Sequence, residues 1–274
     1  MQLKQSDYVL GHTDREQLRL IRQAQILAPA TEHFLRDAGI DLGMRVLDIG
    51  CGVGDVTMLV AQLVGPQGKV TSIDLDEASI ATAQKRTSAV GLGNTTFHRA
   101  DILTFVDAEP FDAIIGRFVL EFVPEPAATV SRLCGLLRPG GIMAFQEPSW
   151  DIWLDHTAHL PLRMAVTTIL RDAFVASGAN TEMELPLYRG VMAANLTSPQ
   201  LRLVLPTGDT PEFRGLLYDL LLAVWERADA LRLPLESLGD PTTLAARLDD
   251  ELDAYKSFAS FVCLVGMFAR KRAE

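Results

Sequence analysis

One stretch near the start of the chain, Arg45-Val-Leu-Asp-Ile-Gly-Cys-Gly-Val-Gly-Asp55, constrains the fold more than any other. The apolar residues Val46, Leu47 and Ile49 predict a short buried strand, and residues 55–64 after the glycines predict a helix. Glycine suits the turn between them because the backbone bends sharply there and approaches a ligand with no side chain in the way. A strand, a glycine turn and a helix in this order present helix N-terminal amides where open α/β sheets bind their ligands.

The spacing of the glycines narrows the kind of ligand. Dinucleotide-binding folds use G-x-G-x-x-G, whereas Gly50, Gly52 and Gly54 alternate and follow Asp48, which lies inside the strand. A carboxylate near the turn suits an ammonium group better than a pyrophosphate. The spacing therefore disfavours a nicotinamide-dependent oxidoreductase, and we recognise no catalytic Tyr/Lys or His pattern for one in the sequence.

The segment Asp48-Ile-Gly-Cys-Gly-Val-Gly54 resembles the nucleotide-binding loop of the class I S-adenosylmethionine (SAM)-dependent methyltransferases. The signature of that family is a hydrophobic strand followed by D-x-G-x-G-x-G, and the segment matches it at every fixed position. The resemblance is close over residues 40–150 and loose in the remainder. It implies SAM as the cofactor and a seven-stranded sheet whose last strand is antiparallel.

The order of the predicted elements agrees with such a sheet. Strands are expected at 69–74, 95–99, 111–115 and 142–146 in alternation with helices, which indicates a parallel, doubly wound arrangement. Other helices are expected at 13–27, 30–38, 160–176, 185–194, 213–231 and 242–255, and other strands at 201–205 and 261–270. We therefore predict an α/β fold with a doubly wound seven-stranded sheet, Rossmann-like, carrying helical lid insertions.

Four regions are expected along the chain. Residues 1–40 form an N-terminal helical lid, and residues 41–150 form the SAM-binding core. Residues 151–198 form a helical substrate cover. Residues 199–274 complete the core sheet and contain a helical insertion at 213–256.

The resemblance implies which residues hold SAM. They lie in the N-terminal segment, the glycine loop and the ends of three following strands: Tyr8, Asp48, Gly50, Cys51, Gly52, Gly54, Asp74, Leu75, Asp101, Ile102, Arg117 and Phe118. Asp74 accepts hydrogen bonds from both ribose hydroxyls, and Leu75 flanks the adenine. Asp101 accepts from the adenine amino group while Ile102 donates its backbone N–H. A solvated loop acid is the alternative for Asp74, and a helix N-cap is the alternative for Asp101.

The fourth strand indicates the class of substrate. In the family, residues at the positions of Arg117 and Phe118 contact the methionine part of SAM through main-chain groups. DNA and protein-amide methyltransferases carry Asn/Asp-Pro-Pro-Tyr there, whereas this chain has Gly116-Arg-Phe-Val-Leu-Glu-Phe-Val-Pro124. The segment therefore resembles the small-molecule branch. Tyr8 and His12 are expected to fold over the site as a lid, with a disordered tail as the alternative.

Three residues are candidates for the chemistry: Glu147, His156 and Glu121. Methyl transfer from a sulfonium is an in-line displacement that depends on alignment and a dry pocket, but a hydroxyl acceptor also needs a base within hydrogen-bond reach. Glu147 is the first choice because it follows the fifth strand, where it contacts the substrate or orients other residues. The ordinary pKa of histidine suits His156 to the role of base, with a structural histidine as the alternative.

Apolar and aromatic side chains in the predicted cover indicate a hydrophobic or aromatic acceptor, methylated at O, N or C. Those expected to contact it are Trp150, Trp153, Met164, Tyr188, Met192 and Trp225, together with His12. Ligand pockets are lined in this way, although aromatic residues at helical spacing also build cores. The apolar stretch at 213–231 is compatible with a homodimer contact or with the core.

Composition excludes several other classes. The net charge is −10 and the one basic run is Arg270-Lys-Arg272, so a nucleic-acid partner is not supported. Cys51, Cys134 and Cys263 are too scattered for a disulfide framework or metal cluster, and no metal is expected. The sequence shows no signal peptide and no membrane-spanning run, so we expect a cytoplasmic protein. Two alternatives to a small-molecule enzyme stay open: a catalytically silent SAM-binding regulatory module, and a protein or RNA methyltransferase.

Overall fold

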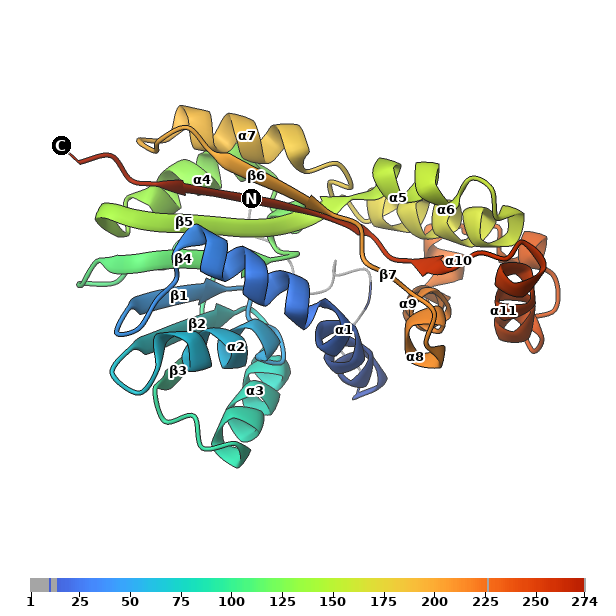
Figure 1. Cartoon of the computed structure of the whole chain (residues 1–274), viewed down its shortest axis with the longest axis horizontal. Helices are drawn as coiled ribbons and strands as arrows, with labels where there is room; N and C mark the ends of the chain where they lie inside the picture. The colour runs from blue at the N-terminus through green and yellow to red at the C-terminus, as the bar shows by residue number, and fades with distance from the viewer. Residues whose placement is uncertain (1–9, 11–13, 226, 274) are drawn as a thin grey trace.

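A sheet of seven strands, counted over the described residues, forms the centre of the molecule (Figure 1). The computed structural model describes residue 10, residues 14–225 and residues 227–273. The strands lie in the order β3-β2-β1-β4-β5-β9-β6. Their bounds are β1 Arg45–Ile49, β2 Lys69–Asp74, β3 Thr95–Arg99, β4 Phe111–Arg117, β5 Leu137–Ser149, β6 Gln200–Val204 and β9 Cys263–Arg270.

The directions of the strands confirm the predicted fold class. Strands β1 to β5 pair in parallel, whereas β9 pairs antiparallel with both β5 and β6. Parallel neighbours need crossover connections, which the intervening helices provide. The carboxyl ends of β1, β2, β4 and β5 therefore meet at one edge of the sheet, next to the point where the strand order reverses between β1 and β4. Open α/β sheets bind ligands at such an edge.

Helices cover both faces of the sheet. On one face, α1 (Asp14–Ala38) and α2 (Asp55–Val64) bury apolar side chains against β1, β4 and β5. On the other face, α4 (Pro126–Cys134) and α7 (Glu184–Ala193) lie side by side over a second apolar core, and α3 (Glu77–Ala89) packs against β2 and β3. Both faces of the central parallel strands β1 and β4 are thus buried, as their apolar sequences require, whereas the edge strand β3 is largely exposed.

A third core belongs to a group of helices beyond the carboxyl ends of the strands, which we call the cap (Figure 1). The chain enters the cap where β5 ends at Ser149. The elements of the cap are α5 Trp150–Thr157, α6 Pro161–Ala176, β7 Thr207–Gly208, α8 Pro211–Arg214, α9 Leu216–Trp225, α10 Ala228–Leu231, η3 Leu235–Leu238, α11 Leu244–Ala254 and β8 Ala259–Ser260. The Glu251 carboxylate on α11 accepts hydrogen bonds from the backbone N–H groups of Leu162 and Arg163, at 2.6 and 2.9 Å, and so caps the free end of α6.

The expected pair of helices at 13–27 and 30–38 is wrong, because α1 is continuous through Pro29. Proline removes its own N–H, but Leu27 before it and Phe34 after it are both fully buried. Packing on both sides of the proline holds the two halves as one helix. The helix expected at 213–231 is likewise divided, into α8, α9 and α10.

The region 151–198 differs from the single substrate cover expected there. Helices α5 and α6 belong to the cap, but α7 packs beside α4 over the sheet. The reason is that Leu187 and Val191 are apolar and buried in the same core as α4. The cap therefore consists of α5, α6 and the later helices α8 to α11.

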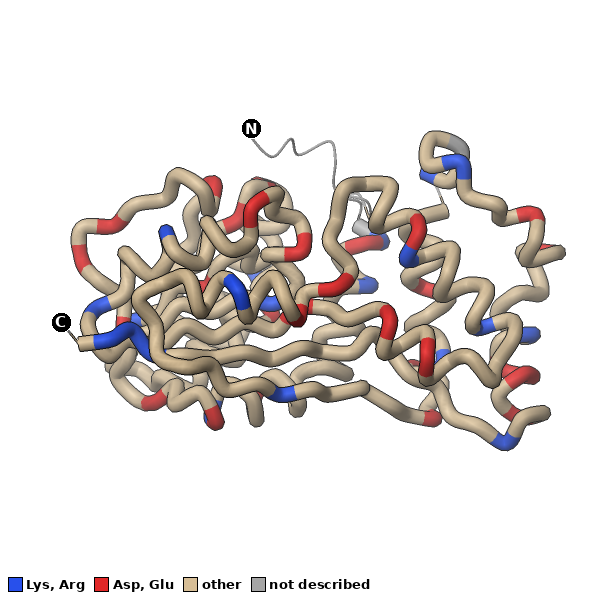
Figure 2. Tube along the Cα trace, turned by 90° about the horizontal axis from the view of Figure 1, so that it is seen from above, with Lys and Arg blue, Asp and Glu red and all other residues tan. Residues whose placement is uncertain are grey.

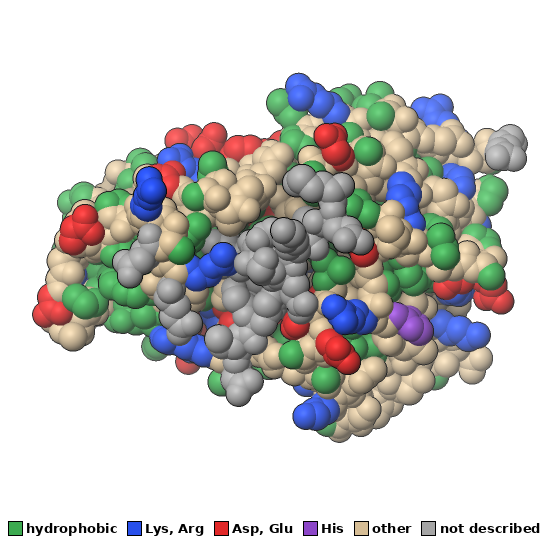
Figure 3. Space-filling view, turned by 180° about the vertical axis from the view of Figure 1, so that it is seen from behind, with side chains coloured by type: hydrophobic (Ala, Val, Ile, Leu, Met, Phe, Trp, Pro, Cys, Tyr) green, Lys and Arg blue, Asp and Glu red, His purple; other side chains and the backbone are tan. Residues whose placement is uncertain are grey.

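Charged residues of both signs are distributed along the trace (Figure 2), and the face seen in Figure 3 mixes hydrophobic, acidic and basic side chains. Neither view shows a continuous basic face among the described residues. Over the same part of the chain, no helix combines the length and the apolarity that crossing a membrane requires.

Candidate functional site

The glycine loop between β1 and α2 has the backbone conformation that its sequence predicts. Gly50, Gly52 and Gly54 have φ angles of +60°, +50° and +86°, which other residues rarely adopt. A Cβ on Gly50 would collide with Val119, and one on Gly54 would lie 2.9 Å from the Cβ of Ala83. A Cβ on Gly52 would meet no atom within 4 Å. Gly50 and Gly54 are therefore required by packing, whereas Gly52 faces open space.

Asp74 lies directly against this loop at the end of β2. Its carboxylate accepts hydrogen bonds from the backbone N–H of Gly52 at 2.8 Å and of Asp76 at 2.9 Å. Burial raises the pKa of Asp74, while these two N–H groups lower it. The open space at Gly52 and the carboxylate beside it fit the adenosyl part of SAM, since a carboxylate can accept from the ribose hydroxyls.

Asp48 lies beneath the loop, inside the sheet. Its carboxylate accepts a 2.6 Å hydrogen bond from the Thr57 hydroxyl on α2, which also lies 3.0 Å from the Ser72 hydroxyl. Burial raises the pKa of Asp48 to about 7, against the opposing effects of Thr57 and of the Arg117 guanidinium. Asp48 therefore ties β1 to α2 beneath the glycine loop. The thiol of Cys51, also in the loop, is buried and its pKa is raised well above the ordinary value, mainly by burial.

The end of β3 offers the groups expected for adenine. Asp101 is half-buried, and its carboxylate accepts a 2.8 Å hydrogen bond from the N–H of Leu103, which forms a local turn. Ile102 is buried, and its carbonyl accepts from Arg132 at 2.8 Å. Leu75 is half-buried after β2. None of the described helices begins here, so this contact belongs to a turn and the helix N-cap raised as the alternative for Asp101 is not formed, while its side chain keeps further acceptor capacity.

The end of β4 has an unusual backbone. Phe118 has φ +58°, which is uncommon for an aromatic residue, and its N–H donates to the Gln146 carbonyl on β5 at 2.9 Å. Such conformations cluster at functional sites because the surrounding structure must hold them. The preceding Arg117 donates to the Thr31 hydroxyl on α1 at 2.9 Å, so its guanidinium points toward α1.

Glu147, at the end of β5, holds the segment that follows Phe118. Its carboxylate is fully buried and accepts from the backbone N–H groups of Val119, Leu120 and Glu121, at 3.1, 2.9 and 3.2 Å. These groups begin the short helix η2 (Leu120–Phe122). Burial raises the pKa of Glu147 to about 7 although the three N–H groups lower it. This geometry gives Glu147 the contacts of a residue that orients others, one of the two roles expected for it.

A pocket of about 430 Å³, counting space open to solvent, lies between the end of β4, the cap and α1, and we call it the cap pocket. Its lining combines one predicted catalytic residue, Glu121, with the predicted aromatic residues Phe118 and Trp150. The rest of the lining was not predicted: Leu10, Arg19, Leu20, Gln23, Phe122, Pro148, Phe174, Leu220, Phe261 and Val262. These residues come from segments far apart in the sequence, so spacing along the chain gave no signal for most of them.

The polar residues on α1 are an exception. Glu16, Arg19 and Gln23 are buried at spacings of three and four residues, which place them on one helix face. The Arg19 guanidinium donates to both Glu16 carboxylate oxygens at 2.7 Å and to the Gln23 side-chain oxygen at 2.6 Å. The helix face could have been identified from the sequence as a polar wall of a pocket.

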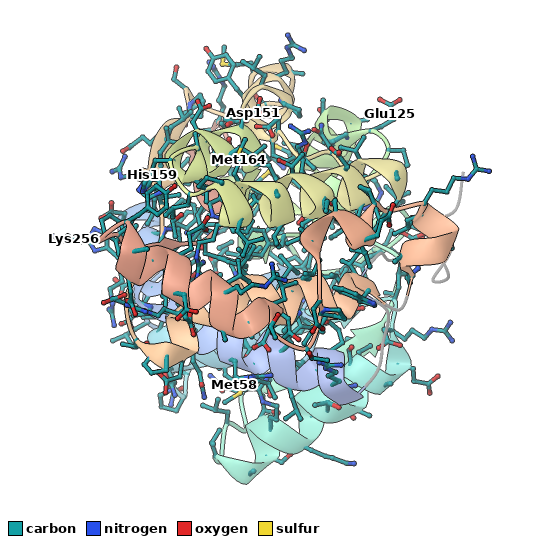
Figure 4. All side chains as sticks on the ribbon, turned by 90° about the vertical axis from the view of Figure 1, so that its right-hand side faces the viewer. Met58, Glu125, Asp151, His159, Met164 and Lys256 are labelled. Carbon is teal, nitrogen blue, oxygen red and sulfur yellow. The ribbon has the colours of Figure 1, made fainter. Side chains whose placement is uncertain are left out.

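Other predicted residues lie in the cap but outside the pocket lining. The Trp153 ring is buried against Trp150, and its N–H donates to the Ser260 carbonyl at 3.1 Å. The Nδ1 of His156 lies 3.1 Å from the Ser260 hydroxyl, and burial lowers the pKa of the imidazole. Met164, labelled on α6 in Figure 4, and Trp225, at the end of α9, are half-buried.

The structure does not bring the remaining predicted substrate residues to the pocket. Tyr188 and Met192 are 42% and 53% exposed on α7, because the opposite side of that helix packs against α4 and the sheet. Tyr8 and His12 lie outside the described residues. No group of three or more His, Cys, Asp or Glu side chains that could hold a metal ion is found in the described part of the chain.

Comparison with known proteins places this geometry in a family. The family model of a methyltransferase domain matches residues 40–185, more than half of the chain. Demethylmenaquinone methyltransferase of Staphylococcus aureus (strain JH9) is 31% identical over 118 residues, covering 43% of this chain and 48% of that protein. The chain thus spans about half the length of the curated relatives it matches.

Solved structures show the same fold. The [4+2]-cyclase SpnF aligns with a TM-score of 0.55 at 19% identity, covering 90% of this chain and 81% of that one. Phosphoethanolamine N-methyltransferase 2 of Haemonchus contortus, solved with phosphomonomethylethanolamine and S-adenosylhomocysteine (SAH), aligns with a TM-score of 0.53 at 15% identity, covering 91% and 52%. The family match, the sheet order and the glycine loop with Asp74 agree. The chain therefore belongs to the class I SAM-dependent methyltransferases, and SAM is its cofactor.

Proposed function

We propose that the protein transfers the methyl group of SAM to a small hydrophobic or aromatic metabolite bound in the cap pocket. The observation that carries the proposal is the position of this pocket. Phe118 lines it and directly follows β4, while the glycine loop follows the neighbouring strand β1. An acceptor in the pocket would therefore lie beside the methionine end of the cofactor.

Methyl transfer from SAM requires little of the protein besides alignment of the methyl group with the acceptor. SAM, when bound, supplies an electrophilic methyl group on its sulfonium. The apolar walls of the cap pocket exclude water, and Glu147 fixes the η2 segment through three backbone N–H groups. Methylation of a hydroxyl, an amine or a ring carbon releases a proton, which passes to solvent through the open side of the pocket, and Glu121 is the carboxyl group of the pocket lining that can position the acceptor.

The name of the curated relative supports an aromatic acceptor, and the enclosed pocket favours a small molecule over a protein or RNA. The mixed surface charge gives no support to a nucleic-acid partner.

A cytoplasmic location and a homodimer are further parts of this proposal. A catalytically silent SAM-binding module is the second candidate, because the fold does not by itself require methyl transfer: it is shared with a protein named for a different reaction, a [4+2]-cyclase.

Incubation with SAM and a panel of phenols, indoles and amines tests the proposal. Mass spectrometry would measure SAH and methylated product in equal amounts, and calorimetry would measure SAH binding. We expect both product and binding. Tight SAH binding without product from any acceptor would favour the silent module, and absence of SAH binding would contradict both candidates.

A further inference from the structure

Two polar atoms in the walls of the cap pocket have no hydrogen-bond partner among the described residues. They are Nε1 of Trp150, at the start of α5, and Oε2 of Glu121, in η2. The two side chains are only 2% and 4% exposed. Since most buried polar groups in folded proteins are hydrogen-bonded, a pair left without partners around one pocket indicates that a ligand supplies them.

Both atoms belong to groups that donate. The indole N–H of Trp150 can only donate. Burial and the neighbouring Glu147 carboxylate raise the pKa of Glu121 well above its ordinary value, which favours the protonated carboxylic acid. A neutral carboxylic acid carries an O–H, and the pocket therefore presents two donors to its ligand.

The rest of the lining favours an uncharged ligand. Apolar residues such as Phe118, Phe174 and Phe261 form most of the wall. The charge of Arg19 is balanced by Glu16 at 2.7 Å. A charged ligand would lose its hydration in this pocket without a countercharge to replace it.

We infer that the acceptor presents an uncharged carbonyl or phenolic oxygen to Trp150 Nε1–H and to the Glu121 carboxyl group. The inference rests on the proposed function and specifies its substrate class. The Trp150 and Glu121 donors fix the orientation of the acceptor through its oxygen, while the apolar walls hold its ring system.

Calorimetry on the SAH-saturated protein tests the inference with three probes of similar size. The probes are 1-naphthol, with a phenolic oxygen, 1-tetralone, with a carbonyl oxygen, and naphthalene, with none. We expect the oxygenated probes to bind about tenfold more tightly than naphthalene, the effect of one or two buried hydrogen bonds.

Trp150→Phe and Trp153→Phe form a matched pair. Both substitutions shorten a buried ring, so both should lower the melting temperature through lost packing. Trp150→Phe also removes an N–H that has no protein partner, so we expect the tenfold preference to disappear. Trp153→Phe also removes an N–H that donates to Ser260, so we expect the larger fall in melting temperature with the preference intact. Loss of the preference in both variants would assign it to a general loosening of the cap and would overturn the inference.

Substitution of Glu121 separates the effect of its hydrogen-bond donor from the effect of its side-chain shape. Glu121→Gln keeps a neutral side chain with an N–H donor and should retain most of the preference, whereas Glu121→Leu should reduce it. Equal binding of all three probes to the wild type, no binding of the oxygenated probes, or a preference that survives Trp150→Phe would overturn the inference. The assay needs no turnover, so a preference without methyl transfer would contradict the proposed function alone.

Discussion

At the scale of single residues, the glycines of the loop differ in whether packing or ligand binding requires them. Gly54 must be glycine because a Cβ would lie 2.9 Å from Ala83. Gly52 has a φ of +50° but faces open space, so a side chain there would obstruct only what approaches from outside the protein. Gly43 has φ +79°, also with open space around it, and lies before β1, away from the carboxyl edge of the sheet.

Gly52→Ala and Gly43→Ala therefore form a controlled comparison. Both should lower the free energy of unfolding by about 1 kcal/mol, because alanine tolerates a positive φ less well than glycine. Only Gly52→Ala should weaken SAH binding, by about tenfold or more, because its methyl group occupies the approach to the loop. Calorimetry and chemical denaturation measure the two effects. Equal SAH affinity in the two variants would mean that the cofactor does not approach Gly52.

Asp74 gives a second prediction at this scale. Asp74→Asn removes the charge and leaves one acceptor oxygen where the N–H groups of Gly52 and Asp76 use one carboxylate oxygen each. We expect SAH affinity to fall about 10- to 100-fold, the usual effect of losing hydrogen bonds to a charged group. Glu77→Gln, at an exposed position three residues further on, is the control and should bind SAH like the wild type. Unchanged affinity in Asp74→Asn would assign Asp74 to the loop alone.

At the scale of elements, the sequence predicted the sheet better than the helices. Strand β2 and strand β3 have the bounds predicted for them, because a short apolar run between turn residues gives a local signal. The two helices predicted at 13–27 and 30–38 are one helix, α1, because packing on both sides of Pro29 holds them together. The cap pocket gathers residues from α1, η2, α5, α6 and α9, so its lining depends on the tertiary fold and could not be predicted from local pattern.

The same limit applies to Glu147. Its position after β5 identified it as a candidate, but only the fold shows that its carboxylate accepts from three N–H groups of the η2 segment. The sequence likewise offered no means of ranking Glu121 above His156, since both lie in segments that follow predicted strands. In the structure Glu121 lines the pocket and His156 contacts Ser260.

Glu147→Gln should disturb the η2 segment. The three N–H groups use both oxygens of the carboxylate, whereas an amide group offers only one acceptor oxygen. We expect kcat to fall at least tenfold with a smaller change in the KM for SAM. Glu251→Gln is the control, since Glu251 also accepts from two backbone N–H groups but does so in the cap, at Leu162 and Arg163. Both variants should lose stability. Equal loss of kcat in the two would show that Glu147 acts through stability alone.

At the scale of the whole molecule, buried carboxyl groups couple folding to pH. The pKa values of Asp48, Glu147 and Glu182 are each raised to about 7, by burial in every case. In the unfolded chain such groups titrate near pH 4. Between about pH 4 and pH 7 the folded protein therefore binds more protons than the unfolded chain, and its stability falls as the pH rises through this window.

Asp48→Asn tests this coupling. The wild-type free energy of unfolding should decrease from pH 5 to pH 7 and level off above the folded pKa, with a contribution of up to about 4 kcal/mol from Asp48 across its full range. Asparagine does not titrate, so the slope should be smaller in Asp48→Asn. Denaturant unfolding at several pH values measures it. Identical slopes in the two proteins would show that Asp48 titrates in the folded protein as it does in the unfolded chain.

The most direct test of the site as a whole is the crystal structure of the complex with SAH. We expect the ribose of SAH to lie against Asp74 and its adenosyl part to pass along Gly52. We expect its sulfur to lie at Phe118 and to face the cap pocket between Glu121 and Trp150. In SAM bound the same way, the methyl group on that sulfur would face the proposed acceptor. A sulfur atom that faces away from the cap pocket, or an SAH molecule bound elsewhere, would contradict the account.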